Sequence, residues 1–495
     1  MARIAFVQNL SYAYLGTMYL SALLKRSGHS VDVFIEGGQG LAALAKDIAL
    51  FNPDIIGFSC TTGAHNWALE AACFFKQDFK KTLIVFGGPH PTFFPEIINE
   101  PQVDVVCRGE GEYPLRDLAD RLSAGRVYFD IANLWVKTGA GVYKNEVRSL
   151  IADLDELPFP DRSIYTKKYP YLNKSQQVFI AGRGCPFSCA YCFNHALKKI
   201  YADKGVFVRR RNTAKVIEEI SQVKTKGGLR VVYFQDDTFI IDKHYCRELL
   251  EEYRQKIGRP FICLLRADLV DEEIVKALKQ AGCLNAFFGV ETGSEQLRAD
   301  LLKRNITDAQ LEKTAGLLHK YGIKFRTYNM FGLPGEDQAA AMKTVELNIK
   351  LKTDYPWSSL LQPFPGTELG EYAKVNNMLD AENCFEPSFF KTSGIKSPDK
   401  RIIINLHKLF FFAVKFPFLL PLIKFAIKKD LAGFFDLAFL SGYVWSFKWS
   451  EGLSWPEVFQ IANANVRNFF FVKKPGRHYT QCKAQSMPAA KHRRP

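Results

Sequence analysis

Two stretches of this 495-residue chain alternate short apolar runs with amphipathic segments, and this alternation constrains the fold more than any other feature. Apolar runs without a polar face are typical of strands that are buried on both sides of a sheet. Amphipathic segments between such runs predict helices that cross over to a parallel neighbour and cover the sheet. The sequence therefore predicts an α/β protein with two parallel sheets.

The first stretch, residues 1–130, predicts a doubly wound, flavodoxin/Rossmann-like domain. Such a sheet binds ligands at the carboxyl ends of its strands, but no G-x-G-x-x-G points to a dinucleotide. The expected helices lie near 17–27, 40–50, 64–77 and 112–123. The expected strands are Arg3–Gln8, Val31–Ile35, Ile55–Cys60, Leu83–Gly88 and Val103–Cys107.

Residues 131–175 read as a connector between the two stretches. Asn133–Lys137 and Gly141–Val147 flank a turn and predict a small hairpin. The proline-rich run Leu154–Asp161 predicts a stiff linker.

The second stretch, residues 176–375, contains six β/α units and predicts a partial (β/α)6 barrel of the TIM type. Six strands leave a lateral opening that eight would close. The expected helices are 213–226, 242–256, 271–281, 294–303, 308–321 and 337–351. The expected strands are Gln177–Ala181, Val231–Gln235, Phe261–Leu265, Ala286–Val290, Lys324–Phe331 and Ser358–Gln362.

Three cysteines, Cys185, Cys189 and Cys192, follow the first of these strands in a C-x3-C-x2-C spacing. Three thiolates can hold three irons of a [4Fe–4S] cluster and leave the fourth iron open to a small molecule. The alternatives are a zinc knuckle or three unrelated thiols. Zinc prefers four ligands, and His195 follows Cys192 too closely for the usual spacing. The other eight cysteines are scattered and are expected to be buried thiols.

The cysteine spacing, with an aromatic residue before the last Cys, resembles the signature of the radical S-adenosylmethionine (SAM) enzymes. Upstream, Gly-Gly-Pro-His-Pro-Thr-Phe and Val-Asp-Val-Val-Cys-Arg-Gly-Glu-Gly-Glu resemble the cobalamin (B12)-binding domain fused to many of them. The resemblance implies three cofactors: a [4Fe–4S] cluster on the three cysteines, SAM chelated by the open iron, and cobalamin. It also implies reductive cleavage of SAM to a 5′-deoxyadenosyl radical.

For cobalamin, the resemblance places the nucleotide tail on the loops Ser59–Gly63 and Gly87–His90 and the corrin near Asn9–Leu15. The chain lacks the D-x-H-x-x-G motif that supplies a cobalt ligand in other B12 proteins. The alternative is a degenerate flavodoxin-like domain that serves as a scaffold. Candidate contacts are Asn9, Ser59, Thr61, Gly63, Gly87, Gly88, His90, Gly109 and Glu110.

For SAM, the resemblance places contacts at successive strand ends of the barrel. Asp236 or Asp237 would meet the ammonium group, although an acid/base pair is an alternative. Arg266 would meet the carboxylate, although a salt bridge to a loop acid is as plausible. Glu291 would accept from the ribose. Candidate contacts are Tyr191, Phe193, Gln235, Asp236, Asp237, Arg266, Glu291, Gly332 and Pro334.

Residues 376–472 predict a helical, hydrophobic C-terminal domain, and residues 473–495 a basic disordered tail with seven Lys/Arg and no acid. Lysines interrupt the Phe- and Leu-rich segment 402–449, so it holds no uninterrupted apolar run long enough to span a membrane. The segment is expected either to cap the barrel or to lie on a membrane as a basic interfacial helix.

The net charge of +15 invites a nucleic-acid partner, but nearly half of it lies in the tail, so we do not expect one. The run Arg209–Arg211 is a candidate for an anionic substrate or a cofactor phosphate. Unpaired cysteines and the absence of a signal peptide predict a cytoplasmic protein, with membrane association left open through 402–449.

The leading hypothesis is a radical SAM enzyme that, with cobalamin, methylates an unactivated carbon of a small or lipid-like substrate. Its expected partner is an electron donor such as flavodoxin or ferredoxin. The alternatives are a cobalamin-dependent cyclase or oxidoreductase without methyl transfer, a non-catalytic cobalamin or cluster sensor, and a nucleic-acid modifier.

Overall fold

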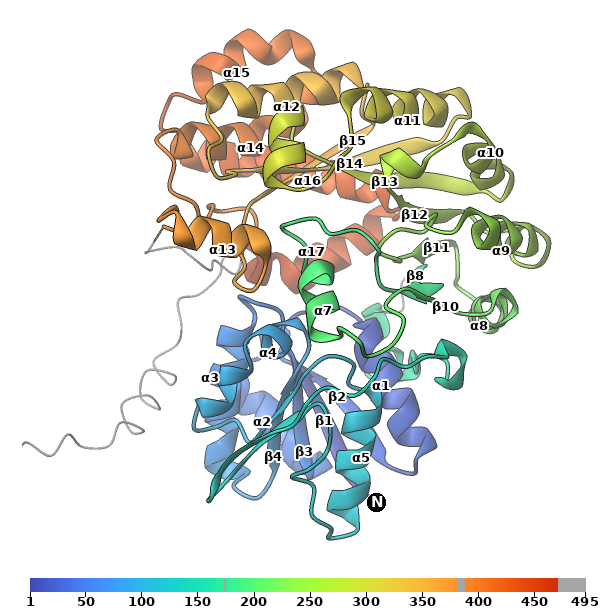
Figure 1. The fold of residues 1–495 in the computed structure, drawn as a ribbon, viewed down its shortest axis with the longest axis vertical. Coiled ribbons are helices and arrows are strands. Elements are labelled where there is room, and N and C mark those ends of the chain that lie inside the picture. Colours follow the sequence, from blue (N-terminus) through green and yellow to red (C-terminus); the bar gives the residue numbers. More distant parts are fainter. Residues whose placement is uncertain (173–174, 381–387, 471–495) are drawn as a thin grey trace, which may run out of the picture.

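The computed structural model describes residues 1–172, 175–380 and 388–470 (Figure 1). A blue layer built by the N-terminal sheet occupies the lower half of the view, and the second sheet with its helices occupies the upper half. The α/β class and the order of the two sheets agree with the sequence prediction. The finer domain boundaries stay predictions.

The first sheet has seven strands in the order β2-β1-β3-β4-β5-β6-β7, and β1 to β5 are parallel. Alternate residues of β1 point into two cores: Ile4 and Phe6 into one, Ala5 and Val7 into the other. This is why the strands lack a polar face. The strands are β1 Arg3–Gln8, β2 Ser30–Ile35, β3 Ile55–Ser59, β4 Leu83–Gly87, β5 Val105–Cys107, β6 Leu134–Thr138 and β7 Gly141–Lys144.

The helices of this half cover both faces of the sheet. Side chains of α1 and α5 join the core on one face, and those of α2 and α3 join the core on the other. Such two-sided cover is the doubly wound arrangement that the sequence predicts. The helices are α1 Leu15–Arg26, α2 Leu41–Phe51, α3 His65–Asp78, α4 Pro89–Phe93 and α5 Glu112–Ser123, with a 3-10 turn at Pro95–Asn99.

The connector forms the predicted hairpin, and the hairpin extends the first sheet because β6 pairs antiparallel with β5. Short helical turns follow at Leu154–Glu156, α6 Ser163–Thr166 and Pro170–Leu172. Within α6, the buried Tyr165 hydroxyl donates to Gln8 Oε1 at 2.7 Å. The linker is thereby held against the carboxyl end of β1.

The second sheet has six parallel strands in the order β15-β14-β13-β12-β11-β8. Its edge strands, β8 and β15, do not pair, so the barrel is open on one side. The strands are β8 Gln176–Phe179, β11 Val231–Phe234, β12 Phe261–Leu265, β13 Cys283–Glu291, β14 Lys324–Phe331 and β15 Tyr355–Leu360. A separate two-stranded ribbon pairs β9 Gly182–Arg183 with β10 Arg209–Arg210.

Five helices cover the outer face of this barrel, and each begins at a polar residue whose side chain accepts from the backbone of the first turn. These N-caps are Asn212, Asp242, Asp271, Thr307 and Asp337. The helices are α8 Thr213–Thr225, α9 Lys243–Lys256, α10 Glu272–Gln280, α11 Asp308–Lys320 and α12 Gln338–Lys350. The expected helix 294–303 is instead a wide π-type turn at Leu297–Leu301.

The C-terminal helices complete the barrel wall. Tyr443 on α16 packs against Trp357 on β15, with 4.4 Å between ring centroids. Just past the end of α16, Glu451 accepts from Gln176 Nε2 on β8 at 2.9 Å. The end of α16 and the residue after it therefore contact both edge strands, near their amino ends. The helices are α13 Glu368–Val375, α14 Lys400–Lys415, α15 Leu420–Ala426, α16 Ala432–Ser450 and α17 Trp455–Phe470.

Within the described ranges, no helix combines the length and the hydropathy that crossing a bilayer requires. The predicted tail at 473–495 lies outside the described residues, as does 381–387 of the predicted C-terminal domain.

Candidate active site

The cysteine loop follows β9 and ends where α7, Phe193–Ile200, begins. Cys189 is buried, whereas Cys185 and Cys192 are partly exposed. Lys198 Nζ donates to Pro186 O at 2.8 Å and to Ser188 Oγ at 3.0 Å, and Ala190 N donates to Leu302 O at 2.9 Å. The loop is thus held on both sides of Cys189.

Two guanidinium groups lie beside the Cys189 sulfur. Arg266 Nη1 is 3.5 Å from Cys189 Sγ, and Arg304 Nη1 is 3.9 Å from it. Burial raises the pKa of Cys192 to about 11, so its deprotonation needs compensating positive charge. Three thiols beside two fixed cations form a donor set that fits an anionic iron–sulfur cluster.

Within the part of the chain that the structure describes, no three His, Cys, Asp or Glu side chains are grouped to hold one metal ion. A four-iron cube takes one thiolate on each of three irons, so its ligands need not meet at a single point.

Tyr191 and Glu291, which the sequence predicts as SAM contacts, lie together behind the loop. The Tyr191 hydroxyl donates to Glu291 Oε1 at 2.9 Å. Arg304 lies against both, with Nη1 3.5 Å from the Tyr191 hydroxyl and Nε 4.0 Å from Glu291 Oε1, and Nη2 donates to Gly289 O at 3.1 Å. Burial raises the pKa of Glu291, and the Arg304 charge opposes that rise. The strand end therefore presents a buried, partly neutralised carboxyl group.

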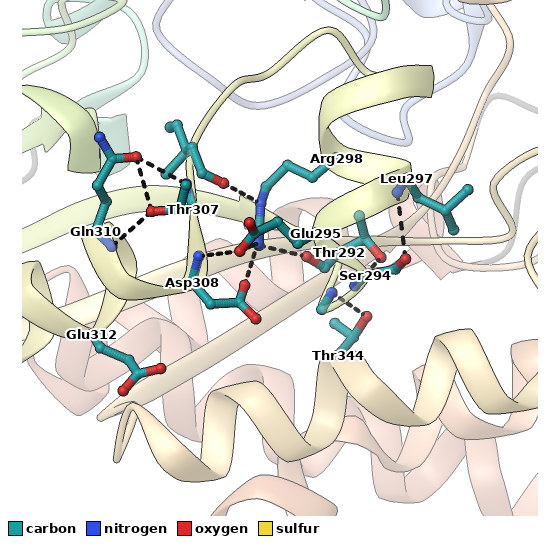
Figure 2. Close-up of polar contacts among 12 residues, drawn as sticks. Thr292, Ser294, Glu295, Leu297, Arg298, Thr307, Asp308, Gln310, Glu312 and Thr344 are labelled. Carbon is teal, nitrogen blue, oxygen red and sulfur yellow. Dashed lines mark hydrogen bonds and ion pairs between the residues drawn. The ribbon is translucent and has the colours of Figure 1, made fainter.

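The backbone at Glu291 is in the left-handed region, with φ +66°, where a residue with a side chain is strained. The loop that follows is tied down by the fully buried Arg298, which donates to Thr292 O at 2.9 Å and to Ile306 O at 2.7 Å and pairs with Asp308 (Figure 2). Figure 2 also labels Thr344 on α12. Its Oγ1 accepts from Gly293 N at 2.8 Å, which ties the loop to that helix. These contacts hold Glu291 in its unusual conformation.

The two aspartates after β11 lie in different surroundings. Asp236 accepts from Ala181 N at 3.0 Å and lies 3.4 Å from Arg210 Nη1, and burial raises its pKa to about 6. Asp237 hydrogen bonds with Asn194 on α7, and burial raises its pKa as well. Asp236 is thus fixed to the link between β8 and β9, whereas Asp237 faces the cysteine loop. Gln235 immediately precedes them, and its backbone N–H donates to Phe179 O at 2.9 Å.

The turn after β14 carries the predicted Gly332 and Pro334. The buried Glu336 Oε2 accepts from Gly332 N at 2.6 Å and from Leu333 N at 3.2 Å, and burial raises the pKa of Glu336 to about 7. Pro334 lines a cavity of about 510 Å³ together with Ala190 of the cysteine loop. The turn and the cysteine loop are therefore neighbours.

Phe193 connects the barrel to the first sheet. Its ring stacks on Phe93 from α4 at 4.7 Å and lies 5.2 Å from Phe364, which follows β15. The predicted role of Phe193 was a backbone contact to adenine; the structure shows its side chain at the junction of the two halves.

A cavity of about 330 Å³ lies at the carboxyl edge of the first sheet. Glycines and apolar side chains make up most of its lining, and Ile180 and Arg183, which precede the cysteine loop, form part of its wall. Five of the predicted cobalamin contacts line it: Ser59, Gly87, Gly88, Gly109 and Glu110.

At two positions around this cavity, the backbone lies so close to other parts of the chain that only glycine fits. A Cβ at Gly88 would lie 2.9 Å from Cys60 N, and one at Gly109 would lie 1.9 Å from the Tyr201 hydroxyl. Both glycines have φ in the left-handed region, +91° and +73°. A hollow of this size, lined by glycines and apolar side chains, fits a flat apolar group such as the base of a cofactor's nucleotide tail.

The remaining predicted cobalamin contacts do not line this cavity. Asn9, Thr61 and Gly63 lie on neighbouring strand-end loops. His90 is buried, stacks on His65 with 3.7 Å between ring centroids, and lies 3.1 Å from Thr62 Oγ1. Burial lowers the pKa of His90 to about 3, so its imidazole is neutral.

Each member of the basic run Arg209–Arg211, the candidate for an anionic ligand, pairs with a carboxylate of the chain. Arg209 Nη2 lies 2.9 Å from Glu110 Oε1, Arg210 pairs with Asp236, and Arg211 Nη1 lies 2.6 Å from Glu219 Oε2. Arg183 also reaches Glu110, at 3.1 Å. These pairs join the rim of the first sheet to the barrel.

Arg266 forms the salt bridge that the sequence left as an alternative, at 2.8 Å from Nε to Asp268 Oδ1, and its guanidinium also stacks over Phe187 at 3.7 Å. Sequence reasoning missed Arg304, Phe187 and Arg183. Arg304 lies in a loop without a motif, and only the fold brings it to Cys189. The sequence could have indicated Phe187 as a site residue, because it lies between two of the cysteines.

Comparison with known families gives two matches. The model of the radical SAM superfamily matches residues 179–347, and the model of the B12 binding domain matches residues 9–119. An uncharacterized methyltransferase of Pyrococcus horikoshii is 31% identical over 371 residues, which cover 74% of this chain and 79% of the relative. The anaerobic magnesium-protoporphyrin IX monomethyl ester cyclase of Rubrivivax gelatinosus is 26% identical, covering 72% of this chain and 66% of the relative.

Two solved structures share the fold. The cobalamin-dependent SAM radical enzyme OxsB, with aqua-cobalamin and SAM bound, has a TM-score of 0.67 at 15% identity and covers 97% of this chain and 78% of its own. The radical SAM methyltransferase TsrM of Kitasatospora setae, with cobalamin and a [4Fe–4S] cluster bound, has a TM-score of 0.62 at 18% identity and covers 76% of both chains.

Proposed function

This chain belongs to the radical SAM superfamily and carries a B12-binding domain, and from that premise we propose that it cleaves SAM reductively and, with cobalamin, methylates an unactivated carbon of a small-molecule substrate. When bound, the cluster would supply the electron, SAM the hydrogen-abstracting radical and cobalamin the methyl group. The chain's own residues bind and orient these groups.

The observation that carries the proposal is the position of the first-sheet cavity. Ile180 and Arg183 form part of its wall, and Cys185 follows two residues after Arg183. A cofactor in that cavity would therefore lie beside the cysteine loop, which is the arrangement that methyl transfer to a substrate radical requires.

We assign Cys185, Cys189 and Cys192 to the cluster, with Arg266 and Arg304 stabilising its negative charge. Asp237, beside the cysteine loop, suits the ammonium group of SAM. Asp236 anchors the same turn to the link between β8 and β9. Glu291, held by Tyr191 and Arg304, is positioned to accept from ribose hydroxyls. Gly332 and Pro334 would border the adenine, and the glycines of the first sheet would border cobalamin.

The direct test uses anaerobically reconstituted, reduced protein incubated with SAM. We expect the parent to release 5′-deoxyadenosine and Cys189→Ala to release none, because the cluster loses a ligand. Cys246→Ala, which removes a buried thiol from α9, is the matched control and should retain release. Equal release from parent and Cys189→Ala would refute the mechanism.

The second candidate is radical chemistry without methyl transfer, and the similarity to a cyclase favours it as the alternative. SAM labelled with deuterium in its methyl group separates the two. Methylation predicts label in the product, whereas cyclisation predicts an unlabelled product together with 5′-deoxyadenosine.

We further propose a one-electron donor such as flavodoxin or ferredoxin as a partner, because the cluster must be reduced before each cleavage. A cytoplasmic location remains a prediction from the sequence. We also propose that the segment 402–449 contacts a membrane.

A further inference from the structure

An exposed aromatic strip runs over the C-terminal helices. Its exposed members come from the start of the 3-10 turn before α15, from one face of α16 and from α17. We define the aromatic strip by these residues: Phe416, Phe418, Trp445, Trp449, Trp455 and Phe459.

Ring contacts show that the strip is continuous. Phe418 lies 6.1 Å from Phe416, and Phe416 lies 6.3 Å from the half-buried Phe412. Phe412 lies 5.2 Å from Phe411, which lies 5.4 Å from Trp445. The half-buried phenylalanines of α14 thus join the exposed ends into one surface.

The strip continues from α16 onto α17. Trp445 lies 6.5 Å from Trp449, and Trp455 lies 6.0 Å from Phe459. Lys448 connects the two helices, because its Nζ lies 3.4 Å from the Trp449 ring centroid and 5.1 Å from that of Trp455.

Helix α16 is apolar on both faces, although only one face is covered by protein. Its inner face packs Tyr443 against Trp357, while Phe434, Leu437, Trp445 and Trp449 lie exposed on the other. Contiguous exposed apolar surface of this kind marks an interaction site. A helix that is apolar all round is expected to be covered all round.

Charge indicates what covers the strip. Residues 400–450 contain eight Lys or Arg and two Asp. Of these, Lys424, Lys428 and Lys429 are exposed on and just after α15, and Lys429 Nζ lies 4.8 Å from the Phe425 ring centroid. One of the acids, Asp436, is paired with Lys408 at 2.7 Å. The sequence that follows α17 adds seven Lys/Arg and no acid at 473–495.

We propose that an anionic lipid bilayer docks on the aromatic strip, with the lysines of α15 on the headgroups. Exposed Trp side chains suit the boundary between headgroups and acyl chains, because the ring is apolar and its N–H is polar. Basic residues beside an apolar surface add attraction to anionic lipid. A second copy of the chain fits less well, since it would bring like charges together.

This docking goes beyond the proposed chemistry and does not depend on it. Since α16 also packs against β15 of the barrel, the bilayer would lie beside the catalytic domain. A membrane-resident substrate would then be near the barrel, but the docking is measurable without any substrate.

The test uses intrinsic fluorescence, because three of the six Trp of the chain lie in the strip. The full-length protein is mixed with vesicles of phosphatidylglycerol and phosphatidylcholine, and separately with phosphatidylcholine alone. We expect a blue shift of Trp emission and co-sedimentation with the anionic vesicles, both weakened by salt.

The variant Phe418→Glu/Phe459→Glu places two charges on the strip, at side chains that are 76% and 67% exposed. It should lower vesicle partitioning roughly tenfold or more. The matched control is Leu50→Glu on α2, which changes an 85% exposed side chain and should bind as the parent does. Lys424→Glu/Lys428→Glu should remove the preference for anionic over neutral vesicles.

Unchanged emission, with the protein left in the supernatant of anionic vesicles, would overturn the proposal. So would a lipid-free dimer in sedimentation velocity that Phe418→Glu/Phe459→Glu converts to monomer, because a second copy would then cover the strip. Release of 5′-deoxyadenosine from the same variant separates these outcomes from failure of the proposed enzyme activity.

Discussion

The two strand-end regions of the molecule present opposite surfaces. The carboxyl edge of the first sheet offers glycine backbone and apolar side chains, and the charged Glu110 there is paired with Arg183 and Arg209. The barrel mouth holds two guanidiniums beside a thiol and two buried carboxyl groups with raised pKa values, Glu291 and Asp236.

The difference follows from what each region is proposed to hold. A large flat cofactor can be recognised by shape, so the first region is lined by glycines and apolar side chains that such a cofactor can approach closely. A small, charged nucleoside and an anionic cluster need complementary charge, so the second holds its charges at fixed positions. The contrast predicts that shape changes impair the first site and charge changes impair the second.

The largest expected effect is that of Arg304→Met in the barrel mouth. It leaves Glu291 buried beside Tyr191 without the cation that lies 4.0 Å from its carboxylate, which should destabilise the fold by about 3–5 kcal/mol. Denaturant unfolding measures the loss. Arg304→Met/Glu291→Gln should recover most of the stability without restoring SAM cleavage. If Arg304→Met were as stable as the parent, the barrel mouth would not depend on charge as we infer.

A smaller effect is expected from Gly109→Ala at the first sheet. The new Cβ would lie 1.9 Å from the Tyr201 hydroxyl, in a backbone with φ +73°. We expect a loss of about 2–3 kcal/mol in unfolding free energy and weaker corrinoid binding by absorbance titration. Gly125→Ala has a similar φ, +64°, and open space around its Cβ, so it isolates the backbone part of the effect. Equal corrinoid binding by both variants would argue against recognition by close backbone approach.

The smallest effect concerns Asp236, whose pKa is raised by burial to about 6. A carboxyl group with a raised folded-state pKa favours the protonated form, so the stability it contributes is complete below pH 4 and is lost as the pH rises to about 6. The loss should be on the order of 2–3 kcal/mol. Asp236→Asn should flatten the pH dependence of unfolding between pH 4 and 6 relative to the parent. An unaltered profile in Asp236→Asn would show that this carboxyl group is not buried in the way we describe.

The sequence was sufficient where one physical signal dominated. The strands Arg3–Gln8, Phe261–Leu265 and Lys324–Phe331 were predicted to the residue. In the first two, a nearly continuous apolar run can be buried on both sides only as a strand within a sheet. The α/β class, the partial barrel and the relation to cobalamin-binding radical SAM enzymes followed from strand spacing and motifs, and the comparisons confirm them.

In other regions, tertiary contacts determined the structure against the local sequence pattern. The segment 294–303 has a helical pattern, yet Arg298 turns inward to Thr292 O and Ile306 O and leaves only the π-type turn. The run Arg209–Arg211 looks like an anion site, yet each member finds a partner carboxylate supplied by a distant segment or helix. Arg304 has no local signal. Pairings of this kind depend on which strand ends the fold brings together, and a linear pattern does not contain that information.

The bridge that α16 makes between β15 and β8 has a consequence for biogenesis. Residues 443 and 451 contact Trp357 and Gln176. Because both lie beyond the last barrel strand in the sequence, a nascent chain can pair all six strands before α16 joins the two edge strands.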